Sequence, residues 1–157
     1  LEALAAPPAG HPLDGLLIAI AERPSGGFAR AHDTPAWAIP TPGLTGGFAF
    51  SLARADDYDV ADCAFLPGGD LLTLERRFRW LDGVRVRLRR FSGAEIRPGA
   101  RIGGELILDA DMGYEIDNLE GLSVWRDGGG ATMLTLVSDD NFNWFQRTLL
   151  LEFRYHG

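Results

Sequence analysis

The chain has 157 residues, a usual length for one domain and enough to bury a hydrophobic core. Its formal net charge of −7 argues against nucleic acid as a partner, because a phosphate backbone needs a cationic binding face. No apolar stretch approaches the roughly 18 residues of a membrane helix, so the sequence predicts no membrane span.

Signals for β-strands recur along the whole chain, whereas no window sustains a 3.6-residue apolar period with caps at both ends. The segment 24–46 is rich in Pro and Gly and is predicted to be the longest loop. We therefore predict an all-β fold. Short apolar runs between turn residues predict strands at 16–20, 47–52, 60–65, 71–75, 84–91, 105–108, 121–125, 133–137 and 148–153.

Burial can be predicted for some of these strands. Residues 84–89 alternate Val or Leu with Arg, which predicts one buried face and a row of Arg side chains facing water. Residues 134–137 and 149–153 are more continuously apolar, and we expect both of their faces to be covered. Cys63 is the single cysteine and lies in an apolar strand, so we predict a buried thiol and no disulfide framework.

One short pattern occurs three times in the sequence. Glu2, Asp62 and Glu120 each open a copy, the copies are 60 and 58 residues apart, and self-similarity at this scale favours a β-propeller. Because a closed propeller usually has at least four blades, we predict a single partial propeller of about two to three four-stranded antiparallel sheets. Its exposed edges would self-associate or pair with further N-terminal blades. The approximate units are 1–60, 61–118 and 119–157.

Two stretches resemble a known family. Residues 62–76 contain an acid, a Pro-Gly-Gly-Asp turn and a strand, and residues 117–150 contain N-x-E-G-L, S-D-D-N-F and Q-x-T-L segments. Together they are similar to the "esterase-like activity of phytase" family of bacterial β-propeller proteins, over nearly all of the chain. The resemblance implies a periplasmic or secreted protein that hydrolyses a small-molecule ester or phosphate ester.

The repeated acids are the first candidates for chemistry. Equivalent positions of a propeller lie at equivalent radii, so three carboxylates could converge near the central channel, where a Ca²⁺ ion would relieve their repulsion. The alternative is that each carboxylate accepts backbone N–H groups at the start of a strand. We favour this structural interpretation for Asp62 and leave both interpretations open for Glu120. The predicted Ca²⁺ ligands are Glu2, Asp117, Asn118 and Glu120.

The polar run after the predicted strand 133–137 is the second candidate. Asp139, Asp140 and Asn141 stand where a blade presents a loop, and functional loops concentrate at such places. The alternative is an Asx turn, in which these side chains bond their own backbone. We predict that Asp139 and Asp140 act with Glu120 as catalytic residues and that Asn141 contacts the substrate.

Glu75 and Arg76 form a third candidate, at the exit of the strand 71–75. A second Glu-Arg pair, Glu22 and Arg23, follows the strand 16–20, one unit earlier. An Arg at such an exit can bind a phosphate or carboxylate through a bidentate fork, so we predict that Glu75 and Arg76 contact the substrate. The alternative is that the Arg pairs with an acid of the adjacent blade, and we favour this ion pair.

Several standard chemistries lack their motifs: the sequence contains no G-x-S-x-G elbow, no local zinc spacing, no P-loop and no dinucleotide fingerprint. The favoured hypothesis is a Ca²⁺-assisted ester or phosphoester hydrolase, in which the metal polarises the ester and water attacks. A sugar-lactone hydrolase of similar architecture is a close variant. The alternative from another class is a non-catalytic ligand- or protein-binding propeller whose acidic motifs are structural.

Overall fold

The fold is described from a computed structural model of residues 1–157, which describes all of them except 24–32, 81–82, 115, 117 and 141–146. The described residues form twelve β-strands and two short 3-10 helices. The elements are β1 (Ala3–Ala5), β2 (Leu16–Ile20), β3 (Asp33–Pro40), β4 (Phe48–Ala53), β5 (Asp59–Phe65), β6 (Leu71–Arg79), β7 (Gly83–Phe91), η1 (Gly93–Glu95), β8 (Arg101–Ile102), β9 (Gly104–Asp111), η2 (Met112–Tyr114), β10 (Leu119–Arg126), β11 (Thr132–Ser138) and β12 (Leu150–Arg154).

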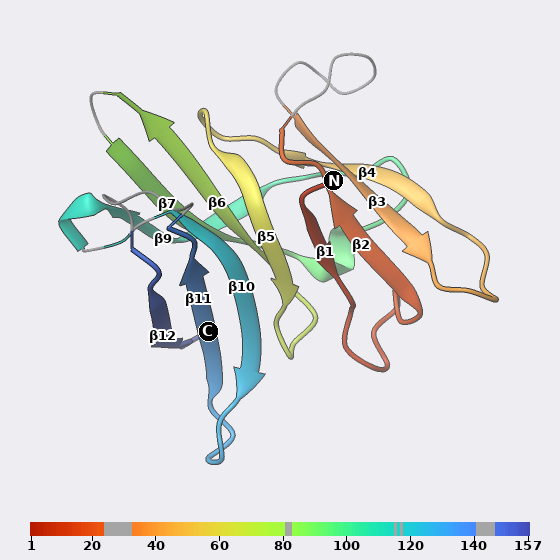
Figure 1. Ribbon diagram of the computed structural model, residues 1–157. Coiled ribbons are helices and arrows are strands. Elements are labelled where there is room, and N and C mark those ends of the chain that lie inside the picture. Colours follow the sequence, from red (N-terminus) through yellow and green to blue (C-terminus); the bar gives the residue numbers. More distant parts are fainter. Residues whose placement is uncertain (24–32, 81–82, 115, 117, 141–146) are drawn as a thin grey trace.

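These strands form three sheets that stand next to one another (Figure 1). The strand orders are β1-β2-β3-β4-β8, β5-β6-β7-β9 and β10-β11-β12, and every neighbouring pair is antiparallel except β4 and β8. The first strand of the middle sheet, β5, contacts the first strands of both other sheets, β1 and β10. The predicted all-β fold with blade-like sheets of a partial propeller is therefore confirmed. Neither of the described helices is long or apolar enough to cross a membrane.

All nine predicted strands are present, but the predicted loop 24–46 is wrong for residues 33–40. These residues form β3, which pairs with β2 on one side and β4 on the other. Pro35 has no N–H to donate, but it lies beyond the last β2–β3 pair, Ile20 with Ala36, and its carbonyl oxygen accepts the Ala21 N–H at 3.0 Å. The short strands β1 and β8 were not among the nine predicted strands.

Two hydrophobic clusters fill the spaces between the sheets. The first lies between the first and middle sheets and includes Ile18, Phe50 and Phe91, and the second lies between the middle and third sheets and includes Leu74 and Leu136. The middle sheet is therefore covered on both faces. The short strand β8 adds a further link between the first and middle sheets. After β7 of the middle sheet, the chain crosses to pair with β4 of the first sheet as β8, and it then returns to the middle sheet as β9.

Two predictions about strand burial are wrong, one for β7 and one for the third sheet. Arg87 and Arg89 of β7 are buried, not exposed, because the first sheet and the segment that follows β4 lie over their face of the middle sheet. In the third sheet, the expectation that both faces are covered is wrong, since Val137 of β11 and Leu150 of β12 are exposed. The prediction for Cys63 is confirmed: the thiol is buried, and burial raises its pKa.

The repeated acid Asp62 links the middle and third sheets. Its two carboxylate oxygens accept the N–H of Cys63 at 2.8 Å and the N–H of Leu122 at 2.7 Å. The register of β5 shifts beside Asp62, and that of β10 shifts at Glu120, so both strands carry a bulge near the acid. The structural interpretation of Asp62 is confirmed.

Candidate functional site

An open cleft of about 180 Å³ lies where the ends of the three sheets approach one another. It receives residues from the segment after β2, the start of β5, the second half of β6, the start of β7 and the segment before β10. Glu22 and Arg23 of one Glu-Arg exit and Arg76 of the other thus contribute to one site. The lining residues are Glu22, Arg23, Asp59, Arg76, Arg77, Phe78, Val84 and Asn118.

Arg76 connects the middle and third sheets at this cleft. It lies inside β6, which continues beyond its predicted end, and its Nη1 donates to Glu120 Oε1 at 2.7 Å and to Asn118 Oδ1 at 2.5 Å. The Asn118 amide nitrogen also donates to Glu120 Oε1 at 2.5 Å. The favoured alternative for Arg76, an ion pair with an acid of the adjacent blade, is confirmed. The three side chains are only partly buried, so solvent still reaches them.

Arg23 connects the first and middle sheets on the other side of the cleft. Its Nη2 lies 3.0 Å from Asp59 Oδ2 and 2.8 Å from Glu22 Oε1. Asp59, followed by Glu22, raises the pKa of Arg23, so the guanidinium stays charged at any ordinary pH. Asp59 is itself held by Arg54, whose Nη2 donates to Asp59 Oδ1 at 2.7 Å and whose Nε donates to the Tyr58 carbonyl oxygen at 2.9 Å.

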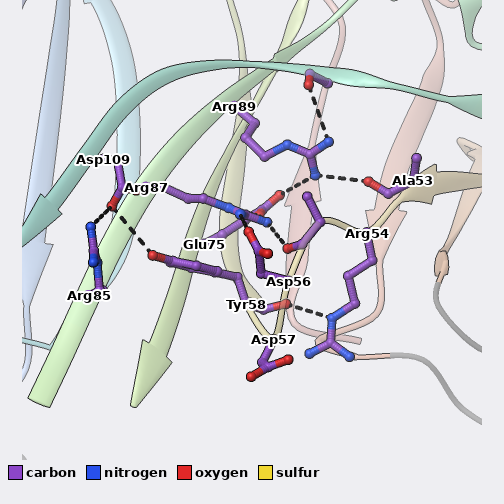
Figure 2. A network of polar contacts seen from close by, with 12 residues as sticks. Ala53, Arg54, Asp56, Asp57, Tyr58, Glu75, Arg85, Arg87, Arg89 and Asp109 are labelled. Carbon is purple, nitrogen blue, oxygen red and sulfur yellow. Dashed lines mark hydrogen bonds and ion pairs between the residues drawn. The ribbon is translucent and has the colours of Figure 1, made fainter. Parts of the chain in front are cut away.

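Glu75, the neighbour of Arg76 in β6, lies in a separate, buried network (Figure 2). Successive side chains of a strand point to opposite faces, so Glu75 faces the first sheet. Its Oε2 lies 2.6 Å from Arg87 Nη2, and its Oε1 accepts the Thr73 hydroxyl at 2.9 Å and lies 3.3 Å from Arg89 Nη1. Glu75 does not line the cleft in which it was expected to contact a substrate.

The two buried arginines fix the segment between β4 and β5. Arg87 Nη2 donates to the Ala55 carbonyl oxygen at 2.6 Å, and Arg89 Nη1 donates to the Ala53 carbonyl oxygen at 3.0 Å (Figure 2). The Arg87 guanidinium also stacks 3.9 Å from the centre of the Tyr58 ring. Burial lowers the pKa of Arg89, and the nearby Arg87 charge acts in the same direction. Sequence reasoning missed this network, although Glu75 stands directly opposite Arg87 in the β6–β7 register.

The comparison with protein families agrees with this architecture. A family model described as phytase-like, "esterase-like activity of phytase", matches residues 1–142, which is most of the chain. The chain belongs to this family. Neither the curated proteins nor the solved structures contain a match to it.

The other predicted site residues of this phytase-like chain are spread over several places. Asp139 lies next to Asn118, because its backbone N–H donates to the Asn118 carbonyl oxygen at 3.3 Å. Asp140 accepts the Thr148 hydroxyl at 3.3 Å. The backbone N–H of Glu2 donates to Ile20 in the first sheet. Asp117 and Asn141 lie outside the described residues.

The described side chains of the phytase-like chain do not fit a calcium site as they stand. A Ca²⁺ site is a cage of six to eight oxygens. Here the Arg76 guanidinium donates to the side-chain oxygens of two of the predicted ligands, Asn118 and Glu120, so these oxygens face a cationic side chain. Within the described ranges, no group of three or more His, Cys, Asp or Glu residues is arranged to hold a metal ion. With Asp117 outside these ranges, the calcium site stays a prediction.

Proposed function

We propose that the cleft binds the anionic group of a small ester and contributes to its hydrolysis. The observation that carries this proposal is a pair of arginines that both line one cleft: Arg23, which is exposed and follows β2, and Arg76, which is partly buried in β6. An Arg guanidinium can hold a phosphate or carboxylate through two parallel hydrogen bonds. In a chain with a net charge of −7, the lining of this cleft carries three arginines, Arg23, Arg76 and Arg77, against two carboxylates, Glu22 and Asp59, and this local balance favours an anionic substrate. Membership of a hydrolase-like family supports the same proposal.

The contacts of Arg76 suggest how binding and hydrolysis would be coupled. When an anionic ester enters, Arg76 exchanges its bond to Glu120 for a bond to the ester oxygen. The Glu120 carboxylate, still held by the Asn118 amide, then accepts a proton from a water molecule. The water oxygen bonds to the phosphorus or carbonyl carbon, the ester bond breaks, the leaving oxygen takes a proton from solvent, and Glu120 releases its proton to solvent to restore the carboxylate. Asp139, whose backbone bonds to Asn118, would orient this water.

A non-catalytic anion-binding cleft is the second candidate. It is favoured by one specific observation, namely that Arg23 and Arg76 both pair with carboxylates of neighbouring segments. In this case the ion pairs join the sheets, and the cleft binds an anion only because both arginines remain accessible to solvent.

Turnover and binding measured on the intact protein separate these proposals. The probes are p-nitrophenyl phosphate and p-nitrophenyl acetate for turnover, and inorganic phosphate for binding by calorimetry. We expect Arg76→Ala to weaken phosphate binding at least tenfold and Glu120→Gln to lower kcat by about 10²–10⁴-fold without a loss of binding. The matched control is Arg154→Ala, which removes an exposed arginine paired with Asp127 in the third sheet and leaves both measurements unchanged.

The remaining outcomes decide between the candidates. Phosphate binding with no turnover of either ester in the wild-type protein supports the non-catalytic cleft. Full turnover by Glu120→Gln removes the proposed role of this carboxylate. A strict requirement for Ca²⁺, seen as loss of turnover in chelator and recovery on addition of the metal, would support the metal-assisted hypothesis instead.

A further inference from the structure

The cleft has an apolar side that the proposed chemistry does not use. Phe78 of β6 and Val84 of β7 both line it, and they are direct cross-strand partners in the β6–β7 register. Phe78 is 69% exposed, although an aromatic ring of this size is more stable when it is covered. The open ring therefore forms a contact surface within the cleft.

The order of residues along β6 places this surface beside the anion site. Arg76 and Phe78 are two residues apart in one strand, so their side chains point to the same face of the sheet. Arg76 is the member that bonds to Glu120 and Asn118, and Phe78 follows it toward the end of β6. A ligand held by Arg76 and extended along β6 would meet the Phe78 ring next.

We propose that the cleft selects anionic esters that carry an apolar group, such as an aryl or acyl chain, directly next to the charged group. The arginines bind the anion and the pair Phe78 and Val84 covers the apolar group, whereas a polyol phosphate would leave this pair exposed and have its own hydroxyls face apolar atoms. This inference rests on the proposed anion-binding function and names the class of substrate for it.

Binding of matched ligands to the intact protein tests the inference. Phenyl phosphate and methyl phosphate carry the same charge and differ in their apolar group. We expect the wild-type protein to bind phenyl phosphate about tenfold more tightly than methyl phosphate. Phe78→Ala should abolish this preference and leave the affinity for methyl phosphate unchanged, while Phe78→Leu should keep most of the preference.

A control separates this contact from a general effect of aromatic residues. Trp125 is 41% exposed and lies near the far end of β10, seven residues after Asn118. Trp125→Ala should therefore change neither affinity. Circular dichroism and a melting curve show whether Phe78→Ala still folds. We expect it to fold, because the Phe78 side chain is exposed.

The outcomes distinguish failure of the inference from failure of the proposed function. If the wild-type protein binds neither ligand, the proposed function fails and the inference fails with it. If both ligands bind equally, the anion-binding function stands and the inference is overturned. If Phe78→Ala keeps the phenyl preference but loses binding to anionic lipid vesicles, Phe78 docks to a membrane surface and the inference is likewise overturned.

Discussion

Glu75 and Arg76 are neighbours in β6, yet they belong to two regions of the molecule with opposite properties. Glu75 faces the first sheet, where it is 3% exposed and contacts Arg87 and Arg89. Arg76 faces the cleft, where the exposed fractions of its side chain and that of Glu120 are 27% and 36%. Both regions join carboxylates to guanidinium groups, so the chemistry is the same and only the burial differs.

The difference in burial determines which ion pairs of the molecule can exchange a partner for a ligand. A buried charge that loses its partner is strongly destabilising, so the Glu75 network has to stay closed. A half-exposed pair exchanges its partner for water or a ligand at little cost, because solvent already screens it. The cleft can therefore change its contacts while the network beneath it remains fixed.

The largest expected effect comes from breaking the buried network. Glu75→Ala removes the buried carboxylate that Arg87 and Arg89 share and leaves Arg87 only its pair with the exposed Asp56, so we expect the free energy of unfolding to fall by about 3–5 kcal/mol. Urea unfolding followed by circular dichroism measures the loss. Glu105→Ala is the control, because this Glu pairs with Arg90 at the surface, and its removal should cost less than about 1 kcal/mol. Equal effects of the two substitutions would show that burial does not distinguish the regions.

An intermediate effect is expected at Asp62, the acid that joins two sheets through backbone groups. Asp62→Ala leaves the partly buried N–H groups of Cys63 and Leu122 without their acceptor. Since an unsatisfied buried donor costs about 1–3 kcal/mol, we expect a loss of stability in this range. The other repeated acid, Glu120, provides the comparison, and Glu120→Ala should lower the melting temperature less than Asp62→Ala. The reverse order would mean that Glu120 carries the structural role.

The sequence predicted most of the fold because its strand signals are local. Alternating or continuous apolar runs between glycine and proline turns located nine strands, and the roles of Cys63 and Asp62 followed from their positions within such runs. The strand β3 was missed because its prolines are a local signal for a loop, whereas pairing with β2 and β4 decides the outcome.

The burial of Arg87 and Arg89 could not be predicted in the same way. An alternating Val-Arg strand is typical of a sheet with one face in water, and only the packing of the first sheet shows that the Arg face is covered. Arg23, Arg76 and Asn118, which the sequence singled out separately, line one cleft that the sequence did not reveal, and their functional roles stay predictions. The separation of Glu75 from Arg76 follows from strand geometry, but which of the two faces is open depends on the neighbouring sheets.

The smallest expected effect, and the sharpest test of the open region, is the coupling between Arg76 and Glu120. A double-mutant cycle with Arg76→Ala and Glu120→Ala should give a coupling free energy of about 0.2–1 kcal/mol, because both side chains are partly exposed. Raising the salt concentration should reduce this value further, since a screened pair loses its attraction first. A coupling above about 2 kcal/mol that does not depend on salt would place this pair in the same class as the Glu75 network. Arg76 could not then leave Glu120 for a substrate, and the proposed exchange would be ruled out.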